Sequence, residues 1–137
     1  MEYDDQAKFV MFSTVAFVLG LAIENVLTGP LTVLVLFLWV PMGIVHIFAS
    51  LAYFRANMFW PLRSILHLVV CFAGGVMFFW LSFSMYNGLN LGGVQLVEGG
   101  ILTQAGWRHI LGIVAIYSGI SLASQLFVVA VGRRVLS

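Results

Sequence analysis

The sequence predicts an all-α integral membrane protein, a four-helix bundle, and three observations lead to that prediction. Of the 137 residues, 62% are hydrophobic and only 8% are charged, with a mean hydropathy of +1.09. A soluble domain carries about 25% charged residues. Four apolar stretches each reach about the 20 residues that a helix needs to cross a bilayer, or exceed them. These stretches and their connections fill the chain, so we expect one transmembrane domain, 1–137, without a soluble catalytic domain.

The predicted spans cover residues 9–27, 31–54, 64–86 and 107–131. Thr28-Gly29-Pro30 is expected to close the first span, because proline cannot continue a helix and glycine suits its C-terminal cap. So short a connection makes the first two spans antiparallel neighbours. Pro41 lies inside the second span, where a helix in lipid tolerates it, usually with a kink.

The basic residues predict the orientation. One side of the predicted bundle carries five of them, Lys8, Arg55, Arg63, Arg133 and Arg134, and the other side carries only Arg108. Basic residues accumulate on the cytoplasmic side of membrane proteins. We therefore expect a multi-pass protein of the cell (inner or plasma) membrane with both termini in the cytoplasm. The net charge of +1 gives no indication of a nucleic-acid partner.

The connection over residues 87–106 is predicted to be a glycine-rich extracytoplasmic loop. Residues 94–98 and 101–104 are apolar enough for two short strands, and Gly99-Gly100 between them suits a tight turn. A small β-hairpin and an irregular loop are both consistent with this pattern.

The fourth predicted span has the best helix-packing face in the chain. Small residues recur along it, Gly112, Ala115, Gly119 and Ala123. Helices in lipid gain more from close backbone approach than from hydrophobicity, and small residues permit that approach. The expected partners, besides the lipid bilayer, are other membrane subunits or a second copy of the chain.

The polar residues of the spans share helical faces with small residues, and we expect those faces to be turned toward other helices. A polar group that faces acyl chains costs several kcal/mol, whereas one that faces a helix finds a partner. The stripes are Ala16, Gly20, Glu24 and Thr28; Gly43, His46 and Ser50; and His67, Cys71, Gly74 and Gly75. The fourth span adds a second, polar side with Ser118, Ser121, Ser124 and Gln125.

Glu24 is the only acidic residue inside a predicted span. An ionisable side chain there is a candidate for proton or ion coupling, with His109 at the same boundary as a second candidate. The alternative is a cap or an interhelical ion pair for Glu24 and an interfacial anchor for His109. The layout resembles that of small multidrug-resistance transporters, whose first helix also carries a glutamate. Glu24 lies near a helix end, however, and no other motif matches, so the resemblance implies no site residue.

His46 and His67 are candidate haem ligands. Paired histidines from neighbouring helices hold b-type haem in membrane cytochromes, and Gly43, Gly74 and Gly75 would make room for the macrocycle. The alternative is that each imidazole bonds to a neighbouring hydroxyl or carbonyl. No metal site is predicted, because Cys71 is the only further ligand nearby.

No nucleophile–base pair, phosphate loop or converging set of carboxylates stands out, so no catalytic residue and no enzyme is predicted. The expected function is a non-catalytic subunit or homo-oligomeric component of a membrane complex, in a setting related to transport. Two alternatives stay open: a b-type cytochrome subunit that uses His46 and His67, and a small proton-coupled transporter that uses Glu24.

Overall fold

The computed structural model describes residues 2–29, 33–55, 59–91 and 93–136. Four helices are present, as the sequence predicts: α1 Glu2–Thr28, α2 Val33–Arg55, α3 Trp60–Ser84 and α4 Gln104–Leu136. Between α3 and α4 lie four short strands: β1 Asn90–Leu91, β2 Val94–Gln95, β3 Val97–Glu98 and β4 Ile101–Leu102.

The helix ends follow from local chemistry. α1 ends at Thr28, where the amide of Gly29 donates to the carbonyl of Asn25 at 2.9 Å. α3 has Pro61 in its first turn, where a backbone amide has no helical acceptor to lose. Pro41 lies inside α2 without ending the helix.

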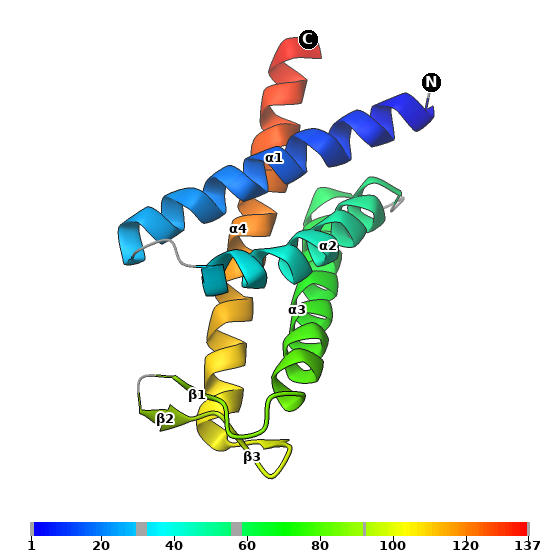
Figure 1. The fold of residues 1–137 in the computed structure, drawn as a ribbon. Helices are drawn as coiled ribbons and strands as arrows, with labels where there is room; N and C mark the ends of the chain where they lie inside the picture. The colour runs from blue at the N-terminus through cyan, green and yellow to red at the C-terminus, as the bar shows by residue number, and fades with distance from the viewer. Residues whose placement is uncertain (1, 30–32, 56–58, 92, 137) are drawn as a thin grey trace.

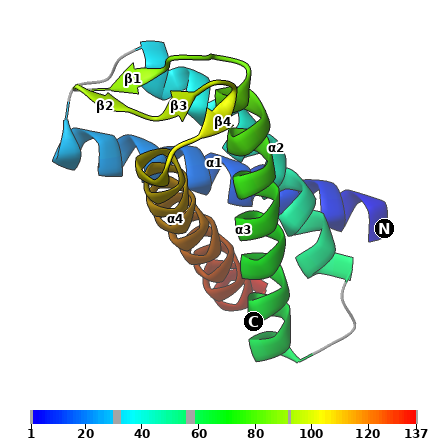
Figure 2. The ribbon, with the colours of Figure 1, turned by 90° about the horizontal axis from the view of Figure 1, so that it is seen from below.

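The helices pair in two layers instead of lying nearly parallel. α3 and α4 run antiparallel side by side, and α1 and α2 cross them at a wide angle (Figures 1 and 2). α2 packs mainly on α3, and α1 on α4 and α2, while α2 and α4 touch only slightly. A Cβ atom on Gly20 would lie 2.7 Å from Cγ2 of Ile120, so the α1–α4 crossing relies on a missing side chain. The structure thus confirms four helices but does not confirm a four-helix bundle.

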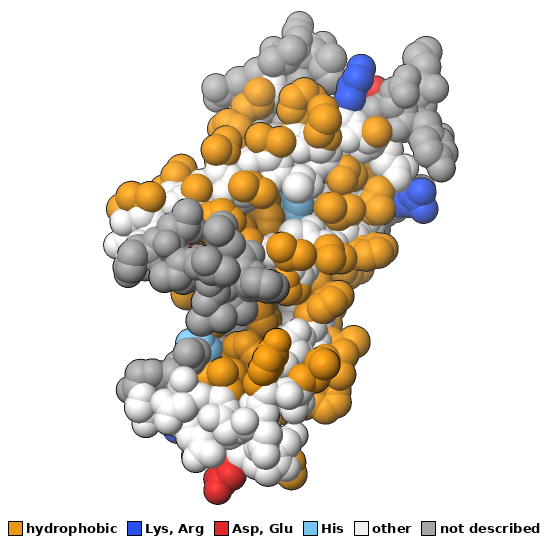
Figure 3. Space-filling view, viewed as in Figure 1, with side chains coloured by type: hydrophobic (Ala, Val, Ile, Leu, Met, Phe, Trp, Pro, Cys, Tyr) orange, Lys and Arg blue, Asp and Glu red, His pale blue; other side chains and the backbone are white. Residues whose placement is uncertain are grey.

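Three helices in the described part of the chain are long and apolar enough to cross a membrane: Asp5–Leu27, Pro61–Ser84 and Gln104–Val131. Hydrophobic side chains cover much of the described surface in Figure 3, and charged groups lie mostly toward the two ends. These features indicate a membrane protein. A fourth crossing by α2, the type of membrane and the orientation of the termini remain predictions.

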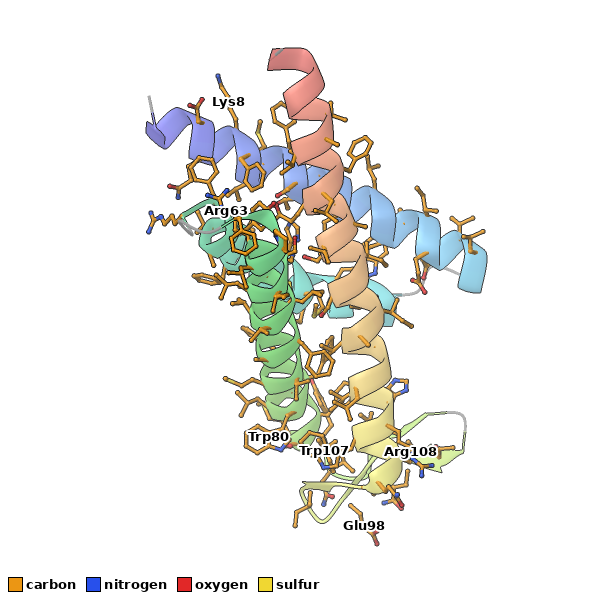
Figure 4. The ribbon with its side chains drawn as sticks, turned by 180° about the vertical axis from the view of Figure 1, so that it is seen from behind. Lys8, Arg63, Trp80, Glu98, Trp107 and Arg108 are labelled. Carbon is orange, nitrogen blue, oxygen red and sulfur yellow. The ribbon has the colours of Figure 1, made fainter. Side chains whose placement is uncertain are left out.

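Charged and aromatic side chains mark the two ends of the α3–α4 pair. In Figure 4, Lys8 and Arg63 lie at one end, and Trp80, Trp107 and Arg108 lie at the other, close to the loop that carries Glu98. Trp80 is 44% exposed and Trp107 is 38% exposed. Indole rings at one level with charged neighbours are typical of a membrane–water interface.

The loop between α3 and α4 forms two hairpins. β3 and β4 pair with Val97 opposite Leu102, and Gly99 and Gly100 between them have φ values of +61° and +77°. A turn with two positive φ angles suits the twist of a hairpin, and glycine adopts it without strain. The predicted hairpin is therefore present; the β1–β2 hairpin before it was not predicted.

The hairpins close the end of the α3–α4 pair through an apolar centre, which we call the hairpin core: Phe79, Phe83, Leu96, Val97, Leu102 and Ile110. Thr103 links it to α4, because its hydroxyl accepts from the amide of Gly106 at 3.0 Å. That contact is a helix N-cap. The same hydroxyl donates to the carbonyl of Gln95 at 2.7 Å, so the cap also fixes the strand.

Candidate functional site

A buried polar cluster lies where the two helix pairs cross, and every helix contributes to it. Its members all have 0% exposed side chains: Ser13 from α1, His46 and Ser50 from α2, His67 and Cys71 from α3, and Ser121 and Gln125 from α4. Polar groups withdrawn this far from water must satisfy one another.

Ser121 is the centre of the cluster. Its Oγ atom lies 2.5 Å from Nδ1 of His46 and 2.8 Å from Nε2 of His67. Sγ of Cys71 lies 3.3 Å from the same oxygen and 3.6 Å from Nε2 of His67. One hydroxyl on α4 therefore joins an imidazole of α2 to an imidazole of α3.

The other edge of the His46 ring faces two serines. Nε2 of His46 lies 3.2 Å from Oγ of Ser13 and 3.2 Å from Oγ of Ser50, and the two hydroxyls are 3.3 Å apart. The amide of Gln125 donates to the hydroxyl of Ser50. Hydrogen bonds thus connect all four helices' polar groups in one chain. From Gln125 it passes through Ser50, His46 and Ser121 and ends at His67, with Ser13 as a branch from α1.

Aromatic rings enclose the cluster. Phe17 stacks on His46 with a centroid distance of 4.5 Å and parallel planes. Tyr53 meets His67 edge-on at 6.2 Å, and the guanidinium carbon of Arg63 lies 5.9 Å from the Tyr53 ring centroid. The imidazoles are therefore packed between apolar faces and are closed to solvent.

The sequence places these groups together through one repeated spacing. His46 and Ser50, His67 and Cys71, and Ser121 and Gln125 are pairs separated by four residues. Residues at that spacing lie above one another on a helix face. The prediction that these faces point toward other helices is confirmed for all three pairs.

The buried face of α1 differs from the predicted one. Ser13, Phe17, Leu21 and Asn25 are buried, whereas Ala16, Gly20 and Glu24 are half-buried and the Thr28 side chain lies outside the described part. The two stripes lie side by side on the helix. The predicted stripe contacts α4 through Gly20, but its neighbour is the more deeply buried one. The missed signal for Ser13 was its four-residue repeat with Phe17, Leu21 and Asn25.

Glu24 and His109 occupy other places in the fold. Glu24 is half-buried and lies within electrostatic range of Tyr117 on α4. His109 is half-buried and stacks with Phe83 at a centroid distance of 6.3 Å, beside the hairpin core. The coupling role proposed for the two residues stays a prediction.

The predicted packing face of α4 is turned outward. Gly112, Ala115, Gly119 and Ala123 are all exposed, and a Cβ atom on Gly112 or Gly119 would meet no atom within 4 Å. Inside the chain, α4 packs through its opposite face, which includes Ile110, Val114 and Ser121. Contact between chains through the small residues stays a prediction.

The arrangement around the histidines does not favour haem. The two ring centroids are 5.9 Å apart, but Oγ of Ser121 occupies the position between them where iron would bind. A Cβ atom on Gly74 would lie 3.1 Å from Cγ1 of Val45, so that glycine serves helix packing and not a macrocycle. The described residues contain no group of three His, Cys, Asp or Glu side chains suited to a metal ion.

Two kinds of chemistry remain open to the buried polar cluster. A serine bonded to an imidazole is the arrangement of an activated nucleophile. Ser121 and both histidines are 0% exposed, however, so no substrate atom reaches them in this structure. The cluster therefore suits contacts between helices and the movement of protons. Comparison of the chain with protein-family models, curated proteins and solved structures finds no match.

Proposed function

We propose that this protein is a non-catalytic component of a membrane assembly, formed with copies of itself or with other subunits through the small-residue face of α4. The observation that carries the proposal is the outward position of Gly112, Ala115, Gly119 and Ala123.

The glycines of the helices support this assignment because they divide into two groups. Gly20, Gly74 and Gly75 each have a side-chain atom of a neighbouring helix within 3.1 Å of a Cβ position. Gly43, Gly112 and Gly119 have none within 4 Å, and of these three the two on α4 are exposed. Glycine costs about 1 kcal/mol relative to alanine in a helix, and close approach of a neighbour is what offsets that cost in lipid. The exposed glycines of α4 therefore fit a neighbour from another chain.

The closed state of the buried polar cluster supports the non-catalytic part of the proposal. Most of its polar atoms hydrogen-bond one another at a crossing of four helices, with Nδ1 of His67 and Oε1 of Gln125 excepted, and its side chains do not open to the surface. Such a centre fixes the angle at which the helix pairs cross. It thereby fixes the direction in which α4 presents its small residues.

Cysteine crosslinking in bilayers tests the interface. Cys71 is the only native cysteine and is buried, so an introduced thiol reports on its own position. The test variant is Gly119→Cys. The matched control is Val69→Cys on α3, which is 58% exposed and lies at a similar depth, since His67 contacts Ser121.

Oxidation is expected to give crosslinked dimers with Gly119→Cys and monomers with Val69→Cys. Native mass measurement in mild detergent is expected to show more than one chain. A monomeric mass together with equal crosslinking at the two positions would overturn the proposal.

A further inference from the structure

We propose that Arg55 and Arg63, with Lys8 beside them, bind the phosphate of an anionic phospholipid at one end of the molecule. The site uses no residue of the buried polar cluster and none of the small-residue face of α4. It therefore goes beyond the assembly role and does not depend on it. Three observations lead to it: the charge at this end, the contacts that hold the two guanidinium groups, and the apolar surface beside Arg55.

The two ends of the α3–α4 pair differ in charge. Asp5 is the acidic residue whose side chain is described at the first end, whereas Glu98 and Arg108 give the second end one charge of each sign (Figure 4). The first end carries three basic side chains from three helices: Lys8 of α1, Arg55 of α2 and Arg63 of α3. Among the described side chains, three positive charges thus meet one negative charge at the end where α2 stops and α3 starts.

Both arginines are held against a neighbouring helix. The Nε–H of Arg55 donates to Oε1 of Gln6 on α1 at 3.4 Å. The guanidinium carbon of Arg63 lies 5.9 Å from the ring centroid of Tyr53 on α2, and Nε of Arg63 is buried without a hydrogen bond in the described part of the chain. Because Nε is occupied in one arginine and covered in the other, a further acceptor binds them through the terminal Nη groups.

A stack of aromatic rings keeps the two arginines close to one another. Phe9 of α1 stacks on Tyr53 at a centroid distance of 5.9 Å and meets Phe54 at 5.5 Å. Phe54 directly precedes Arg55, and Tyr53 is the ring that Arg63 covers. Two positive charges held around one stack repel each other, and an anion that contacts both relieves that repulsion.

Phosphate is the anion that suits two arginines. A guanidinium group is planar, stays charged and binds phosphate oxygens through paired N–H groups. Basic groups between helices at a membrane boundary bind phospholipid head groups in this way. A head group with its own ammonium or choline cation would bring that cation near the arginines, so a lipid with a net negative charge is expected.

The surface beside Arg55 favours a lipid over a soluble phosphate. Ile44, Phe48, Leu51 and Arg55 follow one another at spacings of four, three and four residues, so they share one face of α2. Ile44 is 41% exposed and Phe48 is 63% exposed, and Arg55 lies at the end of this apolar face. A phospholipid contacts the arginine with its phosphate and the apolar face with its acyl chains, whereas a soluble phosphate makes only the first contact.

Native mass spectrometry of the protein in mild detergent tests the site. The protein is titrated with phosphatidylglycerol, which is anionic, or with phosphatidylcholine of the same acyl chains, and the lipids bound per chain are counted. The parent protein is expected to bind phosphatidylglycerol more tightly. Arg55→Gln and Arg63→Gln are each expected to weaken that binding about fivefold, since one basic residue near a membrane surface contributes about 1 kcal/mol.

Arg108→Gln is the matched control, because it removes the same charge at the other end (Figure 4), and it should leave the binding unchanged. Glycerophosphoglycerol, the head group without acyl chains, should not displace the lipid at equal concentration. Equal affinity for the two lipids, unchanged affinity in both arginine variants, or displacement by the soluble head group would each overturn the proposal. If Arg63→Gln loses its helical circular dichroism, Arg55→Gln decides, because the Arg55 side chain is exposed. Lipids are counted per chain, so a failure of the assembly role would not alter the result.

Discussion

The buried polar cluster and the hairpin core are two centres of one helix pair, and they are built in opposite ways. At the cluster, α3 and α4 meet through imidazole, thiol and hydroxyl groups, with Ser121 bonded to His46 and His67. At the hairpin core, the same helices meet through Phe83, Ile110 and the apolar side chains of the strands.

The difference reflects the solvent at each place. The hairpins lie at the end that carries Glu98, Trp107 and Arg108 (Figure 4). At a boundary with water, burial of apolar side chains is favourable because it removes their surface from water. Between apolar helix surfaces in lipid, that driving force is absent, and association relies on polar contacts and small residues. One chain therefore buries apolar side chains in the hairpin core, whereas between the helices it adds a polar cluster to buried apolar residues such as Phe17, Leu21 and Met42.

The largest expected effect comes from an apolar truncation at the hairpin core. Ile110 is fully buried, and Ile110→Ala should lower the free energy of unfolding by about 2–5 kcal/mol, because it removes transfer energy and leaves a cavity. Ile116→Ala on the same helix, where the side chain is 51% exposed, should have a small effect. Unfolding by a denaturing detergent, followed by circular dichroism, measures both. Equal losses would mean that burial near the loop does not stabilise the fold.

A steric change tests how closely the loop packs on α4. A Cβ atom on Gly106 would lie 2.2 Å from the carbonyl oxygen of Leu96, which is a backbone atom and cannot rotate away. Gly106→Ala should therefore destabilise the protein by about 1–3 kcal/mol. Gly43→Ala on α2 meets no atom within 4 Å and should leave stability unchanged or slightly higher. The same unfolding assay compares them, and a harmless Gly106→Ala would refute the close packing.

The sequence predicts the helices well because span length and proline and glycine positions are local signals. It also predicts the inward faces of α2 and α3 and of the polar side of α4. Each of these faces carries a pair of polar residues four positions apart, and exposing such a pair to acyl chains would be costly. The Gly99-Gly100 hairpin likewise follows from local turn chemistry.

The arrangement of the helices could not be predicted in the same way. The wide crossing of α1 and α2 over α3 and α4 depends on which small residue meets which neighbour, such as Gly20 with Ile120. The small residues of α1 marked the stripe that holds the Gly20 contact and missed the more deeply buried stripe that begins at Ser13. Those of α4 lie on a face that is turned outward. Ser121 as the bridge between two histidines is a relation among three helices, which no spacing along the chain reveals.

A smaller effect is expected at the centre of the buried polar cluster. Ser121→Ala leaves imidazole nitrogens of His46 and His67 without this partner, at a cost of about 1–3 kcal/mol for buried polar groups. Hydrogen bonds between helices in lipid average less, so the low end of that range is expected. Ser124→Ala should change the unfolding free energy by less than about 0.5 kcal/mol. A loss as large as that of Ile110→Ala would contradict the contrast between the two centres.

The smallest effect is expected at the edge of the cluster. Gln125 donates to Ser50, but its carbonyl oxygen Oε1 is buried and makes no hydrogen bond. Gln125→Met keeps the length of the side chain, loses the one donated bond and removes the unpaired oxygen. The two changes oppose each other, because the buried unpaired oxygen is removed while Ser50 keeps its contacts with Nε2 and the carbonyl of His46. Unfolding of Gln125→Met should match the parent within about 0.5 kcal/mol. A loss comparable to that of Ser121→Ala would show that Gln125 belongs to the centre of the cluster and that its carbonyl has a partner in the membrane.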